Sequence, residues 1–224
     1  MPDERAMTTQ EIGRALWQSA RNIERAAPEL DALMGELSEL LVNARPDGVR
    51  FKALDDDESV HNDWITLAWE TYFDVVQHRT GRGRRTSLGW VTVALRLYAA
   101  SEESGGGWDA AGVPKLFVGF DAVSEKPWSG EAFDLNGKGS SDHLEARPPH
   151  LWHYREGEGE EGWADSWFFC VPLAALNDAD ALRQHVVDPL VALIGDGSGA
   201  APDQESAFRD TLACSAPQPE GAVV

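Results

Sequence analysis

Hydrophobic and polar residues alternate along two stretches in the middle of the chain, residues 64–77 and 90–99. In the first stretch the odd-numbered positions are mostly apolar, namely Ile65, Leu67, Trp69, Phe73 and Val75. The second stretch repeats this pattern with Val91, Val93, Leu95 and Leu97. A period of two residues is typical of a half-buried β-strand. We therefore predict two long strands joined by residues 78–89.

The alternation also restricts how these strands pair, because a slip of one residue would turn every side chain to the other face of the sheet. Paired residues must both have odd numbers or both have even numbers. A pairing whose residue numbers add to 166 places Glu70 opposite Arg96 and Asp74 opposite Thr92. We expect this register because it pairs opposite charges on the polar face.

A helix is the alternative for residues 64–78, and it would imply a different chemistry. On a helix Glu70, Asp74 and His78 would stack four residues apart and could share a metal ion. On a strand four residues span about 13 Å, which is too far for a common site. The stretch is rich in β-branched and aromatic residues, so we favour the strand.

Helical periodicity dominates the N-terminal region. Thr8 and Glu11 match a capping box, and apolar residues then recur every three or four positions, at Ile12, Leu16, Ala20, Ile23 and Ala27. Pro28 suits the first turn of a second helix, whose apolar positions are Leu30, Leu33, Met34, Leu37, Leu40 and Leu41. We expect two helices that cover a sheet or each other, with a helical dimer interface as the alternative.

Several shorter elements follow the same logic. Residues 49–54 read as an edge strand, and residues 115–121, 132–135, 151–155 and 164–171 as further strands. The aromatic run in the last of these predicts a central strand buried on both faces, with a solvent-facing aromatic platform as the alternative. Residues 179–194 predict a helix capped by Asn177 or Asp178 and bent or restarted at Pro189.

Together these elements predict a single α+β domain over residues 8–195. It would contain a mainly antiparallel sheet of five to seven strands, with two N-terminal helices and one C-terminal helix packed on it. Residues 1–7 form a polar lead. Residues 196–224 are rich in Gly, Ala, Ser and Pro and predict a disordered tail, apart from a turn around residues 208–212.

The net charge of the protein limits the kinds of partner that we expect it to bind. The 224 residues include 38 acidic and 19 basic ones, a formal net charge of −19. Such a charge disfavours bulk binding to nucleic acid or to an anionic membrane and favours a basic partner. Two cysteines are too few for a disulfide framework, and we find no signal peptide or membrane span. We expect a cytoplasmic protein without a cofactor.

Most candidate catalytic and metal-binding residues do not have the spacing that a shared site requires. Glu70, Asp74 and Asp121 are weak candidates for a metal-dependent hydrolase or nuclease, because they lie on predicted strands without a recognised motif. His143, His150 and His153 are suitable metal ligands. However, His150 and His153 are three residues apart, so on a strand their side chains would lie on opposite faces. No nucleophile elbow or phosphate-binding loop is present. Enzymatic activity is therefore undecided, and the balance is against it.

The predicted hairpin loop is the one strongly basic segment. Arg79, Arg82, Arg84 and Arg85 fall within seven residues and are interleaved with glycine. Arginine binds carboxylates and phosphates through paired hydrogen bonds. This loop is either a solvated tip, a contact with an acidic protein or subunit, or a phosphate contact.

Three functions follow from these observations. We favour a non-catalytic binding protein that engages a basic macromolecule through its acidic surface, as inhibitors, immunity proteins and nucleic-acid mimics do. The alternatives are the metal-dependent hydrolase and a subunit of a larger assembly docked through the arginine loop. The oligomeric state is left open.

Overall fold

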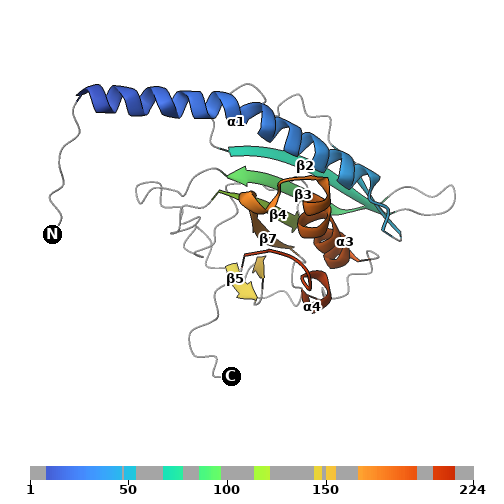
Figure 1. Ribbon diagram of the computed structural model, residues 1–224. Helices are drawn as coiled ribbons and strands as arrows, with labels where there is room; N and C mark the ends of the chain where they lie inside the picture. The colour runs from blue at the N-terminus through green and yellow to red at the C-terminus, as the bar shows by residue number, and fades with distance from the viewer. Residues whose placement is uncertain are drawn as a thin grey trace, which may run out of the picture.

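The computed structural model describes residues 9–46, 48–53, 68–77, 86–96, 114–121, 144–147, 150–154, 166–195 and 204–214. The predicted polar lead, the arginine loop and the short strand at 132–135 lie outside these ranges. Figure 1 shows a twisted sheet with helices on one side and a long helix, α1 (Thr9–Asn43), that extends past the sheet.

Within the described ranges the sheet contains seven strands, and every neighbouring pair is antiparallel. The strands are β1 (Val49–Ala53), β2 (Ala68–Gln77), β3 (Ser87–Arg96), β4 (Lys115–Asp121), β5 (Leu144–Arg147), β6 (Leu151–Tyr154) and β7 (Ser166–Pro172). They lie in the order β1-β2-β3-β4-β7-β6-β5. The α+β class and the antiparallel sheet agree with the prediction. Strand β1 is at an edge as expected, and β5 was not predicted.

The central hairpin is extended where the structure describes it, so residues 68–77 form a strand and not a helix. The predicted register is wrong by two residues. Tyr72 lies opposite Thr92 and Glu70 opposite Ala94, so the paired numbers add to 164. The predicted faces are nevertheless kept, because a shift of two residues preserves the alternation.

The pairing also becomes irregular near the turn of the hairpin, where Val76 lies opposite Ser87. The register changes between Val75 and Val76, close to the turn. Gly89 lies opposite Val75 with a φ of 144°, a conformation that side chains rarely tolerate. A β-bulge of this kind inserts an extra residue on one strand, which the period-two pattern alone does not reveal.

The prediction of two N-terminal helices is wrong, because α1 is one continuous helix with Pro28 inside it. Proline removes one backbone hydrogen bond and crowds the carbonyl of the preceding turn, which normally ends or kinks a helix. Pro28 is exposed here, so the carbonyl it leaves unpaired can be hydrated. On the opposite side Leu30, Leu37 and Leu41 are buried against the domain and hold the second half of the helix in place.

The helical segment after β7 agrees closely with its predicted signals. It comprises η3 (Leu173–Ala175), α2 (Ala179–Leu182), the π-helical turn η4 (Arg183–Val187) and α3 (Asp188–Ile194). The Asp178 side chain caps α2 by accepting a 2.8 Å hydrogen bond from the Ala181 N–H. The π-helical turn directly precedes Pro189, and Gly195 ends the segment with a φ of 61°.

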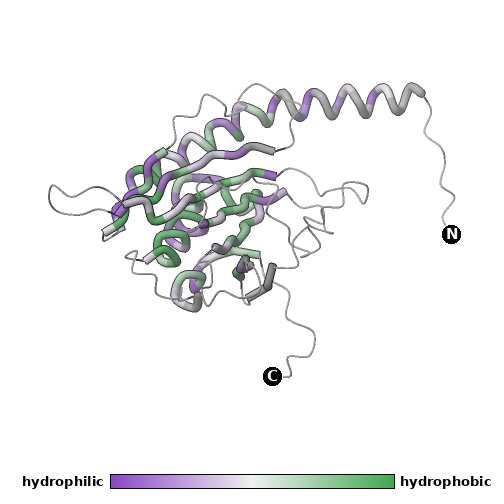
Figure 2. The backbone as a smooth tube through the Cα atoms, turned by 180° about the vertical axis from the view of Figure 1, so that it is seen from behind, coloured by the Kyte–Doolittle hydropathy of each residue, from purple (hydrophilic) through white to green (hydrophobic). Residues whose placement is uncertain are grey.

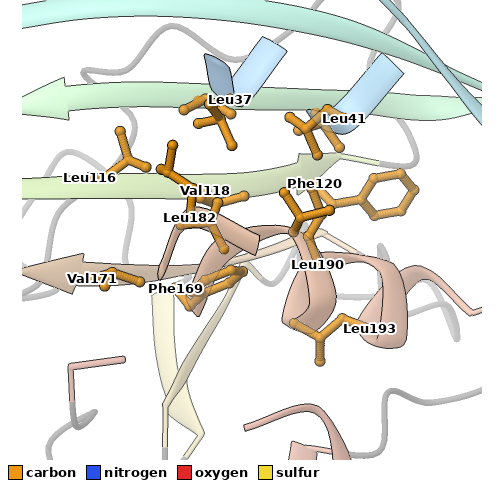
Figure 3. Packing of buried hydrophobic residues seen from close by; sticks show 14 of the residues in the cluster. Leu37, Leu41, Leu116, Val118, Phe120, Phe169, Val171, Leu182, Leu190 and Leu193 are labelled. Carbon is orange, nitrogen blue, oxygen red and sulfur yellow. The ribbon is translucent and has the colours of Figure 1, made fainter. Parts of the chain in front are cut away.

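The main core lies between these helices and one face of the sheet, which we call the helix-covered face. Figure 3 shows Leu37 and Leu41 of α1, Leu182 of α2 and Leu190 of α3 gathered over the sheet, with Phe169 close to Leu182. All of them belong to one core cluster. The odd-numbered residues of β2 and β3 and their cross-strand partners form this face. Figure 2 shows that the central strands contain long hydrophobic stretches.

Residues 204–214, which the sequence placed in the tail, pack against the domain. They include α4 (Gln204–Ala207). Phe208 is buried and its ring contacts Phe169 with centroids 5.3 Å apart. The Cys214 N–H donates to the Cys170 carbonyl at 2.8 Å, and both cysteines are free thiols. The folded region therefore reaches Cys214.

Within the described part of the chain, none of the helices combines the length and the apolar character that crossing a bilayer requires.

Candidate functional site

The second face of the sheet, which we call the opposite face, carries buried polar side chains in its central strands. Arg96, Lys115, Thr92, Asp121 and Ser166 are all buried there. They occupy even-numbered positions in β3 and β7 and odd-numbered positions in β4, as antiparallel pairing requires. Buried charges normally need partners, so this face is a candidate functional site.

One end of the opposite face contains two cations on adjacent strands. Arg96 and Lys115 lie directly opposite each other in β3 and β4, with exposed fractions of 8% and 7%. Arg96 Nη2 donates to Glu70 Oε1 at 3.1 Å, and the Tyr72 hydroxyl donates to Glu70 Oε2 at 2.7 Å. The two oxygens of Glu70 are therefore both engaged. The diagonal ion pair forms despite the shifted register.

The other two catalytic candidates have separate partners. Asp74 accepts a 2.6 Å hydrogen bond from Ser87, and Asp121 accepts a 2.8 Å hydrogen bond from Ser166. Trp90 lies between Asp74 and Asp121 in the cross-strand row. Two strand spacings separate them by about 10 Å, and Glu70 is about 13 Å along β2 from Asp74. The three carboxylates do not converge.

The candidate histidines also have separate environments. His150 precedes β6 and its Nδ1 lies 3.0 Å from the Cys214 carbonyl oxygen. His153 is buried on β6 opposite Trp167. His143 lies outside the described residues. Within the described ranges, no three His, Cys, Asp or Glu side chains come together in a way that would hold a metal ion.

The aromatic residues form core and not a platform. Trp152, Trp167, Phe168 and Phe169 are all at most 2% exposed. Trp152 stacks on Phe168 with ring centroids 5.4 Å apart and planes 4° apart. Strand β7 is covered on both faces, as its sequence predicted. The buried Trp152 Nε1 has no hydrogen-bond partner in the structure.

A hollow of about 500 Å³ lies on the helical side between η4, α3 and the segment around α4. Its lining includes Gln184, Asp188, Arg209 and Asp210, and Gln184 donates to the Asp210 carbonyl at 2.7 Å. The lining mixes both signs of charge on exposed side chains. This arrangement does not select a particular ligand.

The direction of each strand determines at which end of the sheet each connecting segment leaves it. Residues 54–67 join β1 to β2, and residues 97–113 join β3 to β4, at the same end. These two segments contain eight acidic residues and no Lys or Arg, namely Asp55, Asp56, Asp57, Glu58, Asp63, Glu102, Glu103 and Asp109. We call this the acidic end.

The other end of the sheet has a mixed composition. There the segment 78–85 contains Arg79, Arg82, Arg84 and Arg85, and residues 155–165 contain Glu156, Glu158, Glu160, Glu161 and Asp165 beside Arg155. The four arginines lie outside the described residues. The sequence alone shows the arginine loop and the acidic run at 55–58, but only the strand order shows that the segments containing them leave the sheet at opposite ends.

Most of the acidic excess belongs to such segments. Of the 38 acidic and 19 basic residues, 15 and 11 respectively lie in the described ranges. The remaining 23 acidic and 8 basic residues lie outside them. The framework of helices and strands is thus close to charge balance.

Comparison with known proteins finds no matching family model, no matching curated protein and no matching solved structure.

Proposed function

We propose that this protein is a non-catalytic binding protein that engages a basic macromolecule through the acidic end of its sheet. One observation carries the proposal: the two acidic connections, residues 54–67 and 97–113, leave the sheet at the same end. Their strands are neighbours, since β1-β2-β3-β4 are consecutive in the sheet. The two segments that leave the sheet at this end contain eight acidic residues and no Lys or Arg.

Electrostatics explains why such an arrangement favours binding. A surface of one sign raises the local concentration of oppositely charged partners and speeds their encounter. It also rejects partners of like charge, which gives specificity. The antiparallel sheet places the ends of both segments at the same end of neighbouring strands.

The state of the candidate carboxylates supports a non-catalytic role. Glu70 bonds with Arg96 and Tyr72, Asp74 with Ser87, and Asp121 with Ser166. A metal-dependent hydrolase needs carboxylates that share one ion. These carboxylates lie at different positions along the sheet and bind to separate partners.

A matched pair of variants tests the proposal. One variant replaces Asp55, Asp56 and Asp57 by Asn and Glu58 by Gln. The control replaces Glu156, Glu158, Glu160 and Glu161 by Gln, which removes the same four charges at the other end of the sheet. Partners are captured from the native source with each protein, identified by mass spectrometry, and their affinities measured near physiological salt.

We expect a basic partner whose affinity falls at least about tenfold for the acidic-end variant and less than about threefold for the control. Equal losses of affinity in the two variants would show that binding depends only on the net charge of the protein. An acidic captured partner, or tight binding of the wild-type chain to heparin, would contradict the proposal.

A further inference from the structure

The first half of α1 extends beyond the domain that its second half covers. Figures 1 and 2 show this from two opposite sides, with the N-terminal half reaching past the sheet. The helix contacts β1, α2 and η4, and its core residues are Leu30, Leu37 and Leu41. We call residues 9–25 of α1 the arm.

A helix of this length is marginally stable alone. Isolated helices of about 12–15 residues are poorly populated in water, because tertiary packing normally supplies their stability. The arm has about 17 residues, or about 25 Å at 1.5 Å per residue. It therefore benefits from a surface to pack on.

The solvent side of α1 carries an aromatic residue suited to packing. Trp17 is 62% exposed. Tryptophan is a large apolar side chain that dominates interfaces when it is buried. At 100° per residue, Trp17 lies on the same side of the helix as Arg14 and Arg21 of the arm.

The second half of α1 presents a complementary surface on that same side. Ala32 and Gly35 are exposed, and a Cβ atom built on Gly35 would meet nothing within 4 Å. Glu29, Glu36 and Glu39 flank these small residues and are also exposed. This half thus offers a shallow notch bordered by carboxylates, whereas the arm offers an exposed indole bordered by arginines.

We propose that two copies of this chain pair through the solvent sides of their α1 helices in an antiparallel arrangement. A two-fold axis near residue 26 places Trp17 of one copy over Gly35 of the other. Arg14 then lies between Glu36 and Glu39, and Arg21 lies within one turn of Glu29. The opposite charges at the two ends of the helix select the antiparallel orientation over the parallel one.

The two-fold symmetry makes the contact closed and self-limiting. Each arm packs on the second half of the partner helix, so the same surface is used twice and no surface is left for a third copy. The proposal does not depend on the acidic end, because its residues all belong to α1.

Charge exchange tests the pairing. The variant Arg14→Glu with Arg21→Glu places like charges together, and so does Glu29→Arg with Glu36→Arg. The four substitutions combined restore opposite charges. Sedimentation velocity should show a dimer for the wild-type chain, at least about tenfold weaker association for each double variant, and recovery in the combined protein. The control Arg209→Glu changes an exposed arginine outside α1 and should leave the dimer intact.

Cross-linking tests the orientation in a Cys214→Ser background. With a short bismaleimide, Arg25→Cys should cross-link to itself because it lies next to the axis. Arg14→Cys should not, because its two copies would be about 36 Å apart. A mixture of Arg14→Cys and Glu36→Cys chains should form the mixed cross-link.

A monomer at all concentrations would overturn the proposal, and so would a dimer insensitive to both double variants. Self-cross-linking of Arg14→Cys in preference to Arg25→Cys would overturn the antiparallel arrangement. Because every substituted position in α1 is exposed, circular dichroism of each variant should match the wild-type spectrum.

Discussion

The two faces of the sheet are built from the same strands but are closed by different chemistry. The helix-covered face presents aliphatic and aromatic side chains such as Val118 and Phe169 to α1, α2 and α3. The opposite face buries aromatic rings together with charged groups, including Arg96 and Asp121. Apolar burial on the first face needs only shape and area, whereas burial on the second also needs hydrogen-bond partners for its polar atoms.

The opposite face should therefore tolerate fewer substitutions than the helix-covered face. An apolar core tolerates exchanges of similar volume. Replacing one member of a buried ion pair strongly destabilises the protein, because the other charge stays buried without a partner. Each of the following substitutions tests whether the two faces respond differently.

The largest effect should come from Phe169→Ala, which removes a fully buried ring from the helix-covered face. We expect a loss of about 3–5 kcal/mol in the free energy of unfolding, measured by urea denaturation. Phe168→Ala is the matched control on the opposite face, where the ring stacks on Trp152.

We expect Phe168→Ala to cost about 3 kcal/mol, near the lower limit of that range. Of these two rings, Phe169 is the one that contacts Phe208, so limited proteolysis near residues 204–214 should accelerate for Phe169→Ala and not for Phe168→Ala. Equal acceleration in both variants would show that the faces are not independent.

The next effect concerns the Arg96–Glu70 ion pair. Arg96→Met should lower the free energy of unfolding by about 3 kcal/mol, because Glu70 loses a partner in a largely buried setting. The double variant Arg96→Met with Glu70→Met should be more stable than Arg96→Met alone. Urea denaturation of the four proteins completes a double-mutant cycle. A loss below about 1 kcal/mol for Arg96→Met would mean that the pair behaves like a surface salt bridge.

The smallest effect should come from Ser166→Ala, which removes the hydrogen bond that Asp121 accepts. Asp121 is buried, so we expect a loss of about 1–2 kcal/mol. Ser87→Ala removes the similar bond to Asp74 at an exposed position and should cost less than about 0.5 kcal/mol. Thermal unfolding of both variants provides the comparison, and equal losses would contradict a role for burial.

Much of the fold could be predicted because its signals are local. Residues 115–121 alternate in a pattern that gave the bounds of β4, and the Asp178 cap, Pro189 and Gly195 marked the final helical segment. The run at 167–170 indicated a strand buried on both faces. In each case the residue type itself carries the physical preference.

Other features depend on distant residues and were not predictable in this way. Pro28 gave a correct local signal for a helix boundary, but packing of Leu30, Leu37 and Leu41 kept α1 continuous. The packing of residues 204–214 depends on a strand far along the chain, because the Cys214 N–H bonds to the Cys170 carbonyl of β7. The candidate carboxylates were on the expected face, yet their bonds to Ser87 and Ser166 required the true register.

The strand order has a consequence for how the chain acquires its structure. Strands β1 to β4 form a meander of sequential neighbours, whereas β7 reaches β4 across a long separation, with Leu116 opposite Val171. Closing a longer loop costs more entropy and slows the step that requires it. We therefore expect the meander to assemble early, and insertion of β7 beside β4 to be the slow event that gives the later strands a template.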